Sequence, residues 1–431
     1  MHDLVATSRP AFPGRVAGDH RPRSPTGAGS SGGRVRRHRP TLARVETTVD
    51  RIRDFLTTQQ PPTPCLVVDV DAVLARYRSM AAAFAPGRVQ YAVKANPEPA
   101  VVRALVREGA AFDVASPAEI DLCLREGARP DTLSYGNTVK KPADIARAHA
   151  HGVTEFTFDA RGDLDNIARN APGAEVSVRI LVDGGPDSVT PFGHKFGVHP
   201  DHAAELLVAA ASAGLRPVGV SFHVGSQQLD PNAWDVAISS AAKVFTSAAE
   251  RGVRLRRLNV GGGFGVAYTG PAPSVESYAA DVREALATHF PDTQPELVVE
   301  PGRAVVAEAG LIRSEVVLVS RKADADPHRW VYLDIGRYNG LAETENEAIA
   351  YRFDVVGEHS DADGPVIIAG PTCDGDDVLY QRTPYRLPLS LRQGDRIDIL
   401  ATGAYTASYS SVAFNGIEPL RTYCISEGRL I

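Results

Sequence analysis

The sequence is poor in cysteine, and its four cysteines (Cys65, Cys123, Cys373 and Cys424) show no C-x-x-C spacing. That argues against a disulfide framework and against a cysteine-ligated zinc site. The sequence also has no run of about 18 apolar residues, which a membrane-spanning helix needs. Hydrophobic residues make up 43% and charged residues 23% of the chain, which excludes a wholly disordered, collagen-like or coiled-coil protein. We therefore expect a globular protein without a membrane partner, and the cysteine usage suits a reducing cytoplasm.

Charge is unevenly distributed along the chain. Residues 1–45 contain nine arginines and two acidic residues, a net +7, so the overall −6 leaves −13 on the remaining 386 residues. An acidic body argues against nucleic acid as a partner, because phosphates need a basic surface. Residues 1–45 also combine glycine- and proline-rich runs with no apolar periodicity, and we predict that they form a disordered, arginine-rich extension.

At 431 residues, the chain is longer than one hydrophobic core usually supports, so two domains are expected. Between residues 62 and 310, short apolar segments that end in a polar residue or glycine alternate with alanine- and leucine-rich helical stretches. Eight such repeats predict a closed (β/α)8 barrel, an α/β fold; a doubly wound sheet is the alternative. The eight segments are 89–94, 111–113, 133–135, 155–159, 176–179, 218–223, 258–261 and 297–300.

The pattern changes after residue 310. Residues 311–431 contain β-rich runs at 314–319, 330–333, 366–369 and 396–400, separated by turn signals, with few helical stretches. This predicts an all-β second domain, and a strand-like segment near residues 65–70 could join it.

Lys94 is the first candidate functional residue. It ends an apolar strand of the predicted barrel, where side chains at the carboxyl ends of strands face the active site. Lysine is also rare in this chain, with six residues against many arginines. A lysine amine can form a Schiff base with an aldehyde, which arginine cannot do. A salt-bridged surface lysine is the structural alternative.

Further candidates follow the later strands. The glycine run at 261–265 could enclose a phosphate with backbone N–H groups, or simply form a tight turn. Glu300 and Arg303, in the run EPGR, could serve a ring nitrogen and a phosphate, or form a structural ion pair. His223 could stack on a ring, or be a core histidine. An amine, a stacking imidazole, a phosphate loop and an acid together describe a site for pyridoxal 5'-phosphate.

In these residues and the motifs around them, the sequence resembles the alanine-racemase-fold (fold type III) pyridoxal-phosphate decarboxylases, in particular bacterial ornithine and lysine decarboxylases. The resemblance covers roughly residues 60–425. The matching motifs are YAVKAN at 91–96, FDVAS at 112–116, KFG at 195–197, HVGSQ at 223–227, GGGFG at 261–265, EPGR at 300–303, GPTCDG at 370–375 and GAYT at 403–406.

The resemblance implies a cofactor role for several residues. Lys94 would hold the cofactor as a Schiff base, His223 would stack on its ring, and Glu300 would bind its ring nitrogen. The phosphate would be held by a further group, namely Ser226, Gly262, Gly263, Arg303 and Tyr405.

The resemblance also implies a shared active site. Cys373 would protonate the substrate's α-carbon, and Asp374 would bind the substrate's distal ammonium, both reaching the site from the partner subunit of a homodimer. The family's eukaryotic members have an aspartate directly before a glycine where this chain has Ile335, with Asp334 one position earlier. The distal ammonium could therefore contact Asp334, Glu343 or a water.

The activity implied is decarboxylation of L-ornithine to putrescine and CO2, a step in polyamine biosynthesis. Lysine or diaminopimelate decarboxylation is an alternative, although the acidic residues beside Cys373 disfavour the distal carboxylate of diaminopimelate. An amino-acid racemase is disfavoured by the Cys373-Asp374 pair. A regulatory homologue without turnover is disfavoured because both Lys94 and Cys373 are present.

Overall fold

The structure is a computed structural model that describes residues 41–182, 188–190, 193–359 and 362–431. Of the predicted extension at 1–45, residues 1–40 lie outside the described residues. The chain from Thr41 onward forms helix α1 (Thr41–Gln59), so helical structure begins before the boundary drawn from sequence. No helix among the described segments is long and apolar enough to cross a lipid bilayer.

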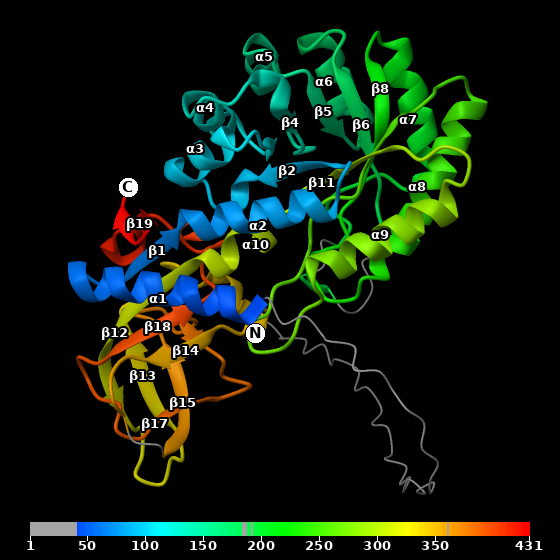
Figure 1. Ribbon diagram of the computed structural model, residues 1–431. Coiled ribbons are helices and arrows are strands. Elements are labelled where there is room, and N and C mark those ends of the chain that lie inside the picture. The colour runs from blue at the N-terminus through cyan, green and yellow to red at the C-terminus, as the bar shows by residue number, and fades with distance from the viewer. Residues whose placement is uncertain (1–40, 183–187, 191–192, 360–361) are drawn as a thin grey trace, which may run out of the picture. The chain divides into compact units, whose positions relative to one another are not determined.

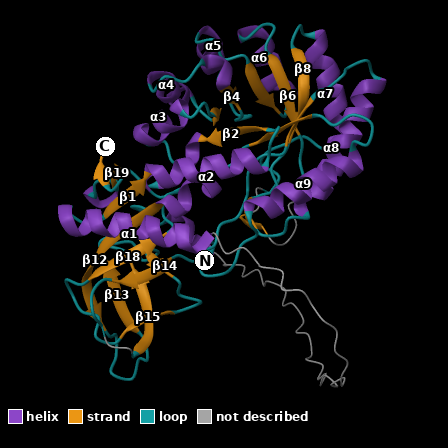
Figure 2. Cartoon of the chain, viewed as in Figure 1, coloured by secondary structure: helices purple, strands orange, loops and turns teal. Residues whose placement is uncertain are grey.

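Eight parallel strands close into a barrel, which confirms the predicted (β/α)8 fold and rules out the doubly wound sheet (Figures 1 and 2). Every barrel strand coincides with one of the eight segments identified in the sequence. In barrel order, they are β2 (Arg88–Ala92), β3 (Ala111–Val114), β4 (Leu133–Tyr135), β5 (Glu155–Phe158), β6 (Glu175–Arg179), β8 (Arg216–Ser221), β10 (Arg257–Asn259) and β11 (Glu296–Val299).

Helices alternate with the barrel strands along the chain and cover them on the outside (Figure 2). Several start with proline in the first turn, where the missing N–H has no intrahelical partner in any case. The helices are α2 (Val70–Ala83), α3 (Pro99–Arg107), α4 (Pro117–Arg125), α5 (Pro142–Ala150), α6 (Arg161–Asn170), α7 (Pro200–Ser212), α8 (Ala233–Glu250), α9 (Val275–His289) and the short α10 (Arg303–Val306). Two short strands, β7 (Ser188–Thr190) and β9 (Ser226–Gln228), pair outside the barrel.

The remaining strands form a second, mostly antiparallel sheet, the β-domain. Its first strand, β1, lies before the barrel in sequence and pairs with β12 and β19. Its members are β1 (Cys65–Asp69), β12 (Gly310–Ser320), β13 (Arg329–Leu333), β14 (Arg352–Val355), β15 (Asp363–Ala369), β16 (Val378–Leu379), β17 (Tyr385–Pro388), β18 (Arg396–Leu400), β19 (Arg421–Ser426) and β20 (Arg429–Leu430).

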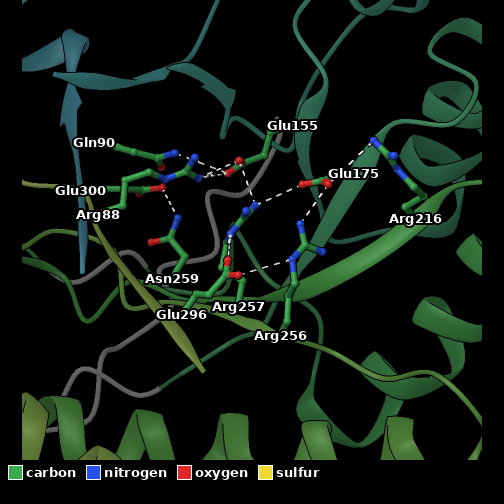
Figure 3. A network of polar contacts seen from close by, with 10 residues as sticks. All are labelled: Arg88, Gln90, Glu155, Glu175, Arg216, Arg256, Arg257, Asn259, Glu296 and Glu300. Carbon is green, nitrogen blue, oxygen red and sulfur yellow. Dashed lines mark hydrogen bonds and ion pairs between the residues drawn. The ribbon is translucent and has the colours of Figure 1, made fainter. Parts of the chain in front are cut away.

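An ionic network joins the amino-terminal ends of six barrel strands, namely β2, β5, β6, β8, β10 and β11 (Figure 3). Arg257, only 8% exposed, donates to Glu155 at 2.9 Å, and Arg88 donates to the same carboxylate at 2.7 Å. Burial raises the pKa of Glu155, but these two arginines outweigh it and the net shift is downward. Glu175 and Glu296 extend the network. The charged side chains of this network therefore form ion pairs with one another. The candidate functional residues lie at the opposite, carboxyl-terminal ends of the strands.

Candidate active site

Lys94 lies just after β2, in the 3-10 turn Val93–Ala95. Its Nζ donates to Asp113 Oδ2 at 2.6 Å, from the neighbouring strand β3. Removal of water from the ammonium lowers its pKa, but the charge of Asp113, with smaller effects from Tyr405 and Glu300, outweighs this and the pKa of Lys94 is raised. Lys94 is therefore a charged ammonium that must lose a proton before its amine can act as a nucleophile, and Asp113 is the adjacent acceptor.

Glu300 follows β11, the strand that pairs with β2 on the side opposite β3. Its Oε1 accepts a hydrogen bond from Asn259 Nδ2 at 2.5 Å, at the end of β10 (Figure 3). Burial and the Asp113 charge raise the pKa of Glu300 to about 7, although Lys94 opposes the shift. The carboxyl group can therefore exchange a proton near neutral pH with a basic atom placed beside it.

His223 follows β8. The backbone N–H of Gly225 donates to its Nδ1 at 3.0 Å, so that nitrogen is the unprotonated one. Burial, together with the positive charges of Arg179 and Lys94, lowers the pKa of His223 well below its usual value. The imidazole is therefore neutral, with its proton on Nε2, and offers a flat aromatic face rather than a charge.

Arg303 is 4% exposed and lies at the amino end of α10. It donates to Ser226 Oγ at 3.0 Å and to both carboxylate oxygens of Glu343 at 2.6 and 2.8 Å. Its guanidinium lies 4.9 Å from the centroid of the Tyr405 ring. Its Nε is buried and has no hydrogen-bond partner, so the guanidinium has capacity left for an anion.

These residues line one pocket. Seven of the predicted site residues contribute to it: Lys94, His223, Ser226, Gly263, Glu300, Arg303 and Tyr405. Gly262 lies beside it, since a Cβ there would come within 3.5 Å of His223 Nε2 and within 2.3 Å of the Glu300 carbonyl oxygen. Gly263 has φ +100, and its Cβ would collide with the Gly225 carbonyl oxygen at 2.3 Å. The glycines are thus required for the backbone to pack this tightly around the pocket.

Cys373, Asp374 and Asp334 are not among the described residues that line this pocket. Cys373 and Asp374 lie in the loop after β15, in the β-domain, where the Cys373 side chain is exposed. Asp334 follows β13, and its Oδ1 accepts hydrogen bonds from the Ser314 hydroxyl at 2.6 Å and the Glu315 N–H at 3.0 Å. These three predicted site residues therefore lie outside the pocket that Lys94 lines.

Sequence reasoning assigned no role to Asp113, Asn259 or Arg179, and it considered Glu343 only for the substrate. Asp113 lay inside a quoted motif, FDVAS, and a carboxylate one strand away from a suspected Schiff-base lysine was a usable signal. Glu343 instead neutralises Arg303, a pairing across 40 residues that no local pattern reveals.

Comparison with known proteins agrees with this geometry. Residues 70–307 match the family described as pyridoxal-dependent decarboxylase, pyridoxal binding domain. The chain belongs to this family. It is 33% identical over 362 residues to the lysine/ornithine decarboxylase of Selenomonas ruminantium, covering 82% of this chain and 88% of that protein. It is 32% identical to antizyme inhibitor 2 of Xenopus laevis, covering 82% of this chain and 78% of that protein.

A solved structure shows the same architecture. The lysine/ornithine decarboxylase of Vibrio vulnificus complexed with cadaverine superposes with a TM-score of 0.78 at 30% identity, covering 88% of this chain and 98% of that one. This chain is therefore a decarboxylase of the pyridoxal-phosphate family, acting on an amino acid.

The pocket fits pyridoxal phosphate. Arg303 and Ser226, next to the glycine backbone, would hold the phosphate, because a buried guanidinium with an unused N–H suits an anion. Lys94 would meet the aldehyde, Glu300 the ring nitrogen and the neutral His223 a ring face. When bound, the cofactor supplies a ring that accepts the electrons left as CO2 departs. The protein residues would hold that ring in orientation, and Glu300 would keep a proton on its nitrogen.

The raised pKa of Glu300 predicts a pH-dependent cost in the cofactor-free protein. Folding disfavours ionisation of this carboxyl, so the cost is absent below its unfolded pKa near 4.5 and grows as the pH rises through 7. Glu300→Gln should therefore leave stability at pH 4.5 unchanged and raise it at pH 8 by roughly 1–3 kcal/mol. Thermal unfolding of the cofactor-free variant and parent at both pH values tests this. Equal stabilisation at the two pH values would contradict it.

Proposed function

We propose that this chain decarboxylates L-ornithine to putrescine and CO2, as a homodimer whose two active sites each use residues from both subunits. The observation that carries the proposal is the placement of Cys373 and Asp374: they form a thiol and carboxylate pair on an exposed loop, outside the pocket that holds Lys94. A decarboxylase needs a proton donor for the α-carbon, and a diamino acid needs an anionic partner.

Cys373 is the cysteine best placed for a reactive role, because its thiol is exposed and the other three thiols are not. Cys65, Cys123 and Cys424 are buried. Burial raises the pKa of Cys65 to about 11 and the pKa values of Cys123 and Cys424 to about 12. Those three thiols therefore stay protonated and inert near neutral pH. Cys373 alone of the four is exposed.

The surface around Cys373 supports contact with a second copy of the chain. Tyr409 is 61%, Val412 78% and Phe414 37% exposed, and Asn415 in the same segment contacts Cys373. Exposed apolar side chains of this kind mark protein contact surfaces. An isologous dimer would use this surface twice and complete both pockets.

Ornithine is favoured over diaminopimelate because the groups beside Cys373 are acidic. Lysine is the second candidate, since the Selenomonas ruminantium relative is named a lysine/ornithine decarboxylase. A regulatory role without turnover has a named relative in antizyme inhibitor 2. The placement of Lys94, Glu300 and Arg303 around one pocket, with Asp113 hydrogen-bonded to Lys94, supports catalysis instead.

An assay with ornithine, lysine, arginine and diaminopimelate tests the substrate. We expect the highest kcat/KM for ornithine and a value about tenfold or more lower for lysine, which is the effect of one methylene group. Asp374→Asn should raise the KM for ornithine, whereas Asp376→Asn, at an exposed neighbour, should not. A preference for diaminopimelate, or no CO2 release from any substrate, would reject the proposal.

Mixing two inactive variants tests the shared site. Neither Lys94→Ala nor Cys373→Ala homodimers should convert ornithine to putrescine normally, but a mixed dimer has one site with both defects and one with neither. Random reassortment makes about half of the dimers mixed, so putrescine formation should recover to roughly a quarter of the parent rate. If subunits exchange, as checked with differently tagged chains, and activity does not recover, each subunit completes its own site.

A further inference from the structure

Asn415 contacts the proposed proton donor at two points. Its Oδ1 accepts a hydrogen bond from the backbone N–H of Cys373 at 3.0 Å. Its Nδ2 donates to the Cys373 Sγ at 3.3 Å. A backbone N–H can only donate, so the amide oxygen must face it, which directs the NH2 group to the sulfur.

The backbone around Asn415 explains why asparagine is suited to this position. Asn415 has φ +54, and its neighbours Ala413 and Gly416 have φ +63 and +70. Asparagine adopts this left-handed conformation more readily than most residues other than glycine. Glycine would satisfy the backbone but would lose both contacts to Cys373.

The turn that carries Asn415 is fixed to the rest of the β-domain. Ser411 donates to the Tyr338 carbonyl oxygen through its N–H at 2.8 Å and its hydroxyl at 2.7 Å. The rings of Phe414 and Tyr338 lie 4.8 Å apart. Asn415 therefore presents its amide from an anchored support.

The loop of Cys373 is held on its other side by Asp377, which is 2% exposed. Asp377 Oδ2 accepts from the Thr372 hydroxyl at 2.7 Å and from the Thr372 N–H at 3.1 Å. Asp377 thus fixes the residue before Cys373, while the contacts to Cys373 itself, at both backbone and sulfur, come from Asn415.

We propose that Asn415 is a positioning residue for Cys373, which aims the thiol and stabilises the negative charge left on sulfur when the proton is given to the substrate. The inference rests on the proposed function, in which Cys373 protonates the α-carbon. In the proton transfer, the S–H bond of Cys373 breaks and a C–H bond forms at the α-carbon. The thiolate later regains a proton from water.

Asn415→Asp separates the two contacts, because the aspartate keeps an acceptor for the Cys373 N–H and places a negative charge where the donor to sulfur was. Alkylation of the holoenzyme by iodoacetamide, without substrate, reads the state of this thiol, since the other cysteines are buried. The variant should react about three- to tenfold more slowly at pH 7.5, with the pH midpoint of alkylation moved upward.

Product analysis supplies the second measurement. If the proton reaches the cofactor carbon instead of the α-carbon, hydrolysis by water gives 4-aminobutanal and the amine form of the cofactor. A positioned acid contributes about 10²–10⁴-fold, so Asn415→Asp and Asn415→Gly should raise the ratio of aldehyde to putrescine at least about tenfold. The KM for ornithine should change little, because Asn415 is not assigned a contact with the substrate.

Cys373→Ala sets the reference for both measurements. Suppose that Cys373→Ala raises the ratio of aldehyde to putrescine. If the alkylation rate of Asn415→Asp, or the product ratio of the Asn415 variants, then equals that of the parent, the role proposed for Asn415 is wrong and the role proposed for Cys373 stands. If Cys373→Ala itself gives the parental product ratio, the proposed proton donor is wrong.

Discussion

Closure of the eight parallel strands into a barrel is the constraint on which the active site depends. It brings the carboxyl ends of β2, β3, β8, β10 and β11 to one mouth, so residues more than 200 positions apart, such as Lys94 and Arg303, line a single pocket. The opposite ends of the strands carry charges too, but these are paired with each other around Glu155 and Arg257. At the mouth, by contrast, Asp113 keeps Lys94 charged, and burial keeps the Glu300 carboxyl close to its titration point near pH 7.

In the proposed reaction, the barrel and the β-domain contribute different groups to the active site. The barrel residues would hold the cofactor by its aldehyde, nitrogen and phosphate ends, and the loop after β15 carries the thiol and carboxylate assigned to proton donation and substrate recognition. Because Cys373 and Asp374 do not line the pocket of the chain that carries them, the proposed division of work would make assembly of two chains a condition for activity. The same division makes the orientation of Cys373 depend on Asn415 and Asp377, which belong to the β-domain rather than to the cofactor site.

Local patterns in the sequence were sufficient for the barrel, because short apolar runs that end in a polar residue or glycine alternate eight times with alanine- and leucine-rich helical stretches. They also placed Lys94, His223, Glu300 and Arg303 correctly at strand ends. Contacts between distant segments were not accessible in this way. The pairing of Arg303 with Glu343, the hydrogen bonds of Asn415 to Cys373 and the start of α1 at Thr41 depend on tertiary packing. The sequence marked Cys373 and Asp374 only through family resemblance, since their loop contains no periodic signal.

Every role assigned to the pocket depends on Lys94 as the residue that bonds the cofactor inside the barrel mouth. Borohydride reduction of the holoenzyme followed by peptide mass mapping tests it most directly, with Lys141→Ala, at an exposed lysine, as the control. We expect one pyridoxyl-phosphate adduct, on the peptide that contains Lys94, present in the Lys141→Ala variant and absent from Lys94→Ala. An adduct on Lys140, Lys195 or another lysine, or a reducible adduct that persists in Lys94→Ala, would contradict it.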